Sequence, residues 1–78
     1  MKEGHPQRVF SYKGYRAPYQ YVEDANMWEG GIHRGNMFIE FGGDIEQEAE
    51  EEFHALLDAY LKDCAENGEK PEPPDDED

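Results

Sequence analysis

Residues 44–68 carry apolar side chains at the spacing of one helical face. At 100° per residue these side chains fall within an arc of about 120°, which predicts a single amphipathic α-helix. Asp44 is the expected N-cap, with Gln47 completing a capping-box pattern, and Asn67-Gly68 is the expected stop. The apolar positions are Ile45, Ala49, Phe53, Leu56, Leu57, Tyr60 and Cys64.

Such a helix cannot bury its stripe alone, so the residues before it must supply a matching apolar surface. Three stretches there, residues 12–22, 27–33 and 37–41, have the aromatic and β-branched composition of strands. Arg34-Gly35-Asn36 predicts a tight hairpin turn between the last two. We therefore expect an α+β fold of order β-β-β-α, in which a three-stranded antiparallel sheet packs against the helix.

The first of these stretches is rich in tyrosine. Tyr15, Tyr19 and Tyr21 share odd parity, so a strand places them on one face. Pro18 lacks a ladder donor, which favours an edge strand or a bulge. Three exposed aromatic side chains on such a sheet would suit self-association, and we expect Tyr19, Tyr21 and Trp28 to form a homodimer contact.

The chain is short enough for one domain, with 78 residues and a single cysteine, Cys64. We expect residues 1–8 to be a flexible N-terminus, 9–68 to form the α+β domain and 69–78 to be a disordered, acidic, proline-rich tail. No apolar stretch approaches the ~20 residues that span a bilayer, and residues 1–8 do not resemble a signal peptide. The expected location is the cytoplasm, with no membrane contact.

The net charge of −13 is unevenly distributed along the chain. Residues 1–36 hold five basic and four acidic residues, whereas residues 37–78 hold two basic and sixteen acidic ones. A surface of this kind repels nucleic acid, because affinity for phosphates is built from Lys and Arg. The expected partner is a basic protein, and no direct binding of nucleic acid is expected.

The acidic residues of the predicted helix have two interpretations. They could form a solvated face that keeps the protein soluble, or a docking surface for the basic partner. For the docking surface, the residues that we expect to bind the partner are Glu46, Glu48, Glu50, Glu51, Asp58 and Glu66.

A catalytic or metal site has weaker support in the sequence. His5, His33 and His54 do not have the spacing of metal ligands, and His54 is expected on the outer face of the helix beside Asp58. Cys64 lies on the apolar arc, where a small buried hydrophobe is more common than a nucleophile. We expect no enzyme activity, no metal and no cofactor.

Six short motifs follow one another across residues 9–74, and each is common alone. They are Tyr12-Lys13-Gly14-Tyr15, Trp28-Glu29-Gly30-Gly31-Ile32, Phe41-Gly42-Gly43-Asp44, Glu52-Phe53, Leu57-Asp58-Ala59-Tyr60-Leu61 and the run from Cys64 to Pro71. In this order and spacing they resemble the HicB-like antitoxins. The resemblance implies a degenerate RNase H-like domain that blocks a small basic toxin of the HicA type, an mRNA-cleaving nuclease. Members commonly add a C-terminal DNA-binding segment, which is not expected here after Pro74.

Three functions follow from these patterns. The first is a non-enzymatic, antitoxin-like inhibitor of a basic nuclease. The second is a phage-encoded inhibitor of the anti-CRISPR type, in which helical acids spaced about 4 Å apart imitate the ~3.4 Å spacing of a phosphate strand on a CRISPR effector complex. The third, ranked last, is an RNase H-like enzyme in which Glu23, Asp24 and Glu40 hold magnesium.

Overall fold

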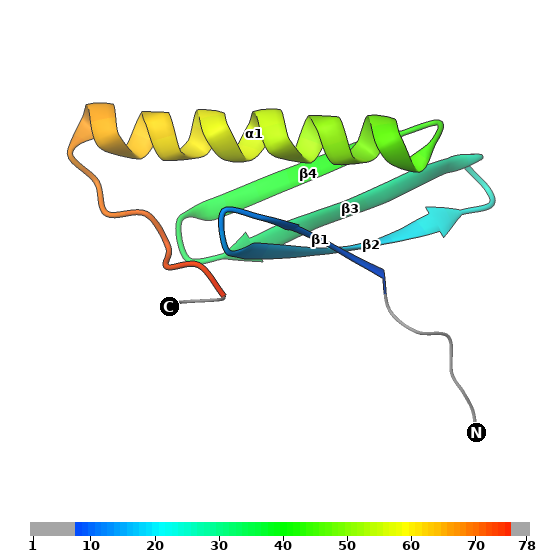
Figure 1. Cartoon of the computed structure of the whole chain (residues 1–78), viewed down its shortest axis with the longest axis horizontal. Helices are drawn as coiled ribbons and strands as arrows, with labels where there is room; N and C mark the ends of the chain where they lie inside the picture. Colours follow the sequence, from blue (N-terminus) through cyan, green and yellow to red (C-terminus); the bar gives the residue numbers. More distant parts are fainter. Residues whose placement is uncertain (1–7, 76–78) are drawn as a thin grey trace, which may run out of the picture.

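Four strands precede the helix, so the α+β class is confirmed and the expected count of three strands is wrong. The computed structural model describes residues 8–75. Its sheet is antiparallel with strand order β1-β2-β3-β4, and α1 lies across one face, running along β4 (Figure 1). The elements are β1 (Arg8–Tyr12), β2 (Tyr15–Val22), β3 (Met27–Arg34), β4 (Met37–Gly43) and α1 (Glu46–Asn67).

The additional strand is β1, which the sequence prediction left outside the sheet. Lys13 and Gly14 both have positive φ, 53° and 83°, and form a two-residue turn that pairs Tyr12 with Tyr15. Positive φ at both central residues is the signature of the type I′ turn, which reverses a chain between antiparallel strands. The chain therefore reverses direction at Lys13-Gly14, inside the stretch 12–22 that the sequence predicts as a single strand. Arg8 belongs to β1, so the N-terminal boundary expected at residue 8 is wrong; residues 1–7 lie outside the described residues.

Pro18 lies in a central strand, which corrects the expectation of an edge strand. The first half of β2 pairs with β1, where Pro18 faces Val9, and pairing with β3 starts only at Tyr19. At Pro18 the strand therefore has a partner on one side only. The missing N–H costs the sheet little there, because no second ladder has yet begun.

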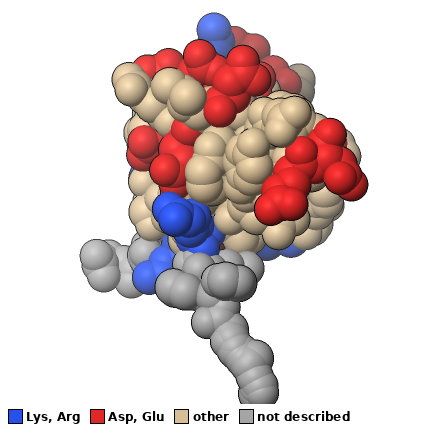
Figure 2. Space-filling view, turned by 90° about the vertical axis from the view of Figure 1, so that its right-hand side faces the viewer, with Lys and Arg blue, Asp and Glu red and all other residues tan. Residues whose placement is uncertain are grey.

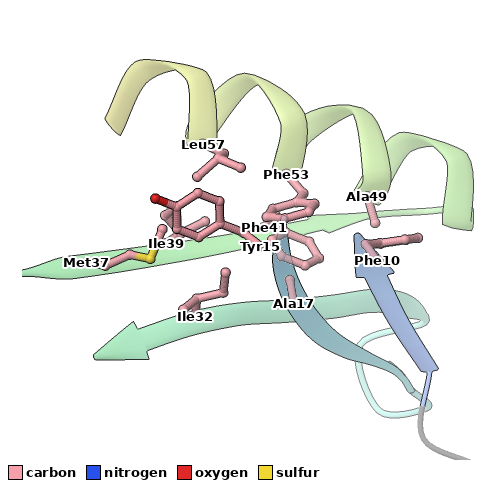
Figure 3. Close-up of a cluster of buried hydrophobic side chains, with 10 residues drawn as sticks. All are labelled: Phe10, Tyr15, Ala17, Ile32, Met37, Ile39, Phe41, Ala49, Phe53 and Leu57. Carbon is pink, nitrogen blue, oxygen red and sulfur yellow. The ribbon is translucent and has the colours of Figure 1, made fainter. Parts of the chain in front are cut away.

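The core lies between the sheet and the helix (Figure 3). Odd-numbered residues of β2 and of β4 point toward α1, as the tyrosine parity predicts for β2. At the centre, Phe53 of α1 is fully buried and its ring lies 5.3 Å from Phe41 of β4 and 6.3 Å from Phe10 of β1. Cys64 is buried, as expected for a small apolar residue.

The N-terminal end of α1 differs from the sequence prediction, whereas its C-terminal end agrees with it. Ile45, not Asp44, is the N-cap, and no side chain caps the helix; the N–H of Asp44 instead donates to Glu48, at 3.1 Å. Ile45 is consequently 54% exposed and does not belong to the buried stripe. At the other end the expected stop is confirmed. Gly68 takes φ 69°, and the N–H of Glu69 donates to the carbonyl of Cys64 at 2.8 Å, as in a Schellman motif.

Residues 69–75 have no regular secondary structure, but they follow a defined course back along the sheet, in contrast to the expected disorder (Figure 1). Tyr60 holds this segment by accepting the N–H of Glu72, at 2.7 Å, while its hydroxyl donates to Asn36, at 2.7 Å. Tyr15 donates to the carbonyl of Glu72, at 2.6 Å. Residues 76–78 of the expected tail lie outside the described residues.

Asp75 continues this attachment at the turn end of the sheet. Its carboxylate accepts Nη1 of Arg34, at 2.8 Å, and the backbone N–H of Arg16, at 2.9 Å. The N–H of Arg16 and the charge of Arg34 lower the pKa of Asp75 below its ordinary value. The C-terminal segment is therefore attached by its backbone to two tyrosines and by its charge to two strands.

Replacing Gly30 by alanine should destabilise the fold by roughly 2–3 kcal/mol, because a Cβ there meets the carbonyl of Pro18 and lies 2.8 Å from the ring of Phe41. Urea denaturation measures the change. Gly68→Ala is the matched control, since nothing lies within 4 Å of its Cβ and only the cost of φ 69°, about 1 kcal/mol, applies. A Gly30→Ala variant no less stable than Gly68→Ala would contradict the packing described here.

Replacing Tyr60 by phenylalanine should release the C-terminal segment, because the hydroxyl accepts from Glu72 and donates to Asn36. The exchange rate of the Glu72 amide hydrogen, measured by NMR, should rise roughly five- to tenfold. Tyr21→Phe removes a hydroxyl whose partner is Asn26, and should leave the Glu72 amide unchanged. Equal exchange in both variants would show that Tyr60 does not hold the segment.

Candidate functional site

The acidic residues of α1 divide into two groups according to what lies beside them. On the side of β1, Arg8 binds Glu46 at 3.0 Å, and Lys13 in the β1–β2 turn binds Asp58 at 2.7 Å. Glu50 lies 3.8 Å from His54, one helical turn away. We call Glu46, Glu50 and Asp58 the paired flank. Arg8 and Lys13 balance the charges of Glu46 and Asp58, while Glu50 has only a histidine beside it, so this flank offers less unbalanced charge to another protein.

The β1–β2 turn also shifts the pKa of Asp58 on the paired flank. Asp58 accepts hydrogen bonds from Lys13 and from the hydroxyl of Tyr12, at 3.1 Å. The Lys13 ammonium holds the pKa of Asp58 below its ordinary value, and Asp58 in turn raises the pKa of Lys13. Tyr19 is the corresponding contact at the helix start, donating to Glu46 at 2.7 Å. Burial is the main reason that the pKa of Tyr19 is raised.

The second group faces solvent, and Glu52 within it lies against β4. We call these five exposed residues the open acidic face: Glu48, Glu51, Glu52, Asp63 and Glu66. Within residues 8–75 no basic side chain lies within 4 Å of any of them. Seen from the end where α1 begins, acidic side chains gather at the top of the molecule, over the helix (Figure 2). The acids of the helix that have no ion pair therefore lie on its solvent-facing surface and along its β4 side.

Glu52 shows where this face meets the sheet. Its carboxylate accepts the backbone N–H of Gly42 in β4, at 2.7 Å. Asp63 follows eleven residues later, about three helical turns, and so lies on the same side of α1. Glu52 also lines a groove of about 280 Å³, together with Glu29 of β3 and Glu40 of β4. Three carboxylates thus line one open groove beside β4.

The structure divides the six residues that the sequence assigned to partner binding. Glu48, Glu51 and Glu66 lie on the open acidic face, whereas Glu46, Glu50 and Asp58 lie on the paired flank. Sequence reasoning missed Glu52 and Asp63, since it treated all exposed acids of the helix alike. Recognising β1 would have separated the two groups, because Arg8 and Lys13 come to the helix with that strand and its turn.

The three aromatic residues expected to mediate self-association lie on the helix-facing side of the sheet. Tyr19 is partly buried and stacks on Phe10 with ring centroids 3.8 Å apart. Trp28 packs against Tyr21, at 5.3 Å, and under the guanidinium of Arg8, at 5.4 Å. Tyr21 alone of the three is an exposed large side chain, at 45%. Homodimerisation through them stays a prediction.

The residues considered for catalysis do not converge. Glu23 and Asp24 lie in the β2–β3 turn, whereas Glu40 lies within β4 opposite Gly31. Within residues 8–75 no group of three or more His, Cys, Asp and Glu side chains is placed to hold a metal ion. A magnesium site of the RNase H type therefore has no geometric support in this part of the chain.

Both described histidines have structural neighbours. His33 lies 3.2 Å from Glu40 and stacks on Phe38. His54 is half-buried and stacks on Tyr12, so its expected place on the outer face of the helix is wrong. His5 lies outside the described residues.

Among the described residues no helix combines the length and the apolarity needed to cross a bilayer. Comparison of the chain with family models, with curated proteins and with solved structures found no match.

Replacing Lys13 by methionine should raise the pKa of Asp58 toward its ordinary value, measured by NMR titration of the side-chain carboxyl. Because the folded-state pKa of Asp58 is lowered, its pairing stabilises the fold above the ordinary carboxyl pKa and is lost as pH falls through the folded value. Lys70→Met, in the exposed segment after the helix, removes the same charge away from this pair and is the control. An Asp58 pKa unchanged by Lys13→Met would rule out the pairing.

Proposed function

We propose that this chain is a non-enzymatic inhibitor that binds a basic, nucleic-acid-acting protein through the open acidic face. The observation that carries the proposal is the separation of charge across α1. The fold pairs Arg8 and Lys13 with acids on the β1 side, and leaves five exposed carboxylates without an ion pair among residues 8–75. Such a surface attracts a basic partner and repels nucleic acid.

A merely solvated face would not require this separation. Basic residues from the first half of the chain could pair with acids on any side of α1. Two of them, Arg8 and Lys13, pair with acids on the same flank. The other flank carries the like charges together. Like charges at i, i+4, such as Glu48 and Glu52, cost a few tenths of a kcal/mol each in an isolated helix. A basic partner would offset that cost on binding, which supports a docking role over a solubility role.

The nearest known arrangement is the one implied by the motif resemblance, in which a HicB-like domain neutralises a HicA-type mRNA-cleaving toxin. The described fold is compatible with that proposal in its broad form, an antiparallel sheet followed by one long helix that begins at Glu46. A HicA-type toxin is therefore the first target to test.

The experiment measures RNA cleavage by a purified HicA-type toxin with increasing amounts of this chain. Inhibition should reach completion near one chain per toxin and weaken as salt is raised, since exposed charges are screened. Undiminished cleavage at saturating chain would reject a HicA-type target.

Neutralising Glu51 and Glu66 to glutamine should weaken inhibition about tenfold, mainly through a slower association rate. Glu48 is left intact because it holds the N–H of Asp44. The matched control neutralises Glu23 and Asp24 in the β2–β3 turn and removes the same charge elsewhere. Equal loss in both double variants would mean that net charge, and not this face, governs binding.

A further inference from the structure

The outer edge of β4 is unpaired along its middle. β4 has β3 on one side only. In an antiparallel ladder alternate residues turn their N–H and C=O groups toward and away from the partner strand. The N–H of Gly42 goes to Glu52 of the helix, so Gly42 belongs to the outward-turned set. Phe38 and Glu40 share its parity, and their backbone N–H and C=O groups therefore also face outward.

Nothing within residues 8–75 covers these groups. No hydrogen bond of the described residues involves the backbone of Phe38 or Glu40 on that side. The side chain of Phe38 is 71% exposed, and β4 contains no Lys, Arg or Pro, the residues that usually protect an edge from further pairing. Glu52 closes the ladder only at the Gly42 end.

Charge indicates which kind of strand this edge accepts. On the helix side, an added strand would run beside Glu52 and Asp63; on the opposite face it would run beside Glu40 and the groove lined by Glu29. Among residues 8–75 the one ion pair made by these carboxylates is that of Glu40 with His33, at 3.2 Å. A second copy of β4 would bring the same carboxylates and oppose them with like charges. A strand rich in Lys and Arg is electrostatically complementary.

We propose that β4 pairs with an edge strand of the basic partner and extends the sheet to five strands. Backbone hydrogen bonds at Phe38 and Glu40 supply the pairing, and alternate basic side chains face Glu52 and Asp63. This inference rests on the proposed function, since it takes the basic partner as given and specifies how that partner docks.

The first test changes only the edge. Phe38→Pro removes an outward N–H and places a ring where a partner strand would bind, while the ladder with β3 keeps its hydrogen bonds. Phe38→Ala is the matched control, since it removes the same aromatic ring and keeps the N–H. Phe38→Pro should bind the HicA-type toxin at least about tenfold more weakly than Phe38→Ala. Thermal unfolding by circular dichroism should show both variants folded.

A second measurement does not depend on any variant. The probe is a synthetic ten-residue peptide of alternating lysine and valine, titrated into the isotopically labelled chain at low salt. The amides of Phe38 and Glu40 should shift and exchange with solvent at least tenfold more slowly. The same peptide with a central proline should produce neither effect.

The outcomes separate this inference from the proposed function. Inhibition of the toxin that is equal in Phe38→Pro and Phe38→Ala, or a peptide that binds without protecting Phe38 and Glu40, overturns edge pairing and leaves the inhibitor proposal standing. Protection of the same amides in the chain alone, rising with its concentration, would assign the edge to a second copy and overturn the basic strand. Absence of any toxin inhibition rejects the HicA-type target itself.

Discussion

The ring of Phe53 holds the two edges of the sheet to one point on the helix. It contacts Phe10 and Tyr12 from β1 and Phe41 from β4, the two strands farthest apart in the sheet order. A flat four-stranded sheet could not bring both edges to one side chain, so the sheet must curl around the helix. This curl follows the right-handed twist of strands, and the burial of three aromatic rings stabilises it.

The curl of the sheet also determines which acidic residues of α1 have a basic partner. Because β1 rises against one flank of α1, Arg8 and Lys13 reach the carboxylates on that flank and no others. On the open acidic face, by contrast, Glu52 accepts the backbone N–H of Gly42 and Glu48 accepts that of Asp44, and none of the five acids has an ion pair within residues 8–75. Packing of apolar rings thus separates a chain of −13 net charge into a balanced side and an unbalanced one, without any change in composition.

The helix and its sheet partner are encoded in local patterns, and the sequence predicts them well. The apolar stripe around Phe53 and Leu57, the stop at Gly68 and the parity of Tyr15 and Tyr19 all depend on spacing within one element. What the sequence missed depends on residues far apart. The strand β1 needs the turn at Lys13-Gly14, a position where lysine takes a conformation that is uncommon for it.

The same limit applies to the candidate site. Helical spacing identifies the exposed acids of the helix. It does not separate Glu46 from Glu48, because the difference between them is the ion pair that Glu46 makes with Arg8 of β1. The course of residues 69–75 was missed for a similar reason. Their composition is that of a disordered tail, and their backbone is held by hydrogen bonds from residues far away in the sequence, among them Tyr15, Tyr60 and Arg34.

The connections between strands have a consequence for how the chain reaches this structure. Two of the three strand turns contain two residues and the third contains four, so every strand pairs with its neighbour in sequence. Closing such short loops costs little chain entropy, and the sheet can form stepwise as a meander. Among the contacts between the strands and the helix, the one with the largest loop to close joins β1 and α1. We therefore expect the folding barrier to lie at the docking of the helix, after the hairpins have begun to form.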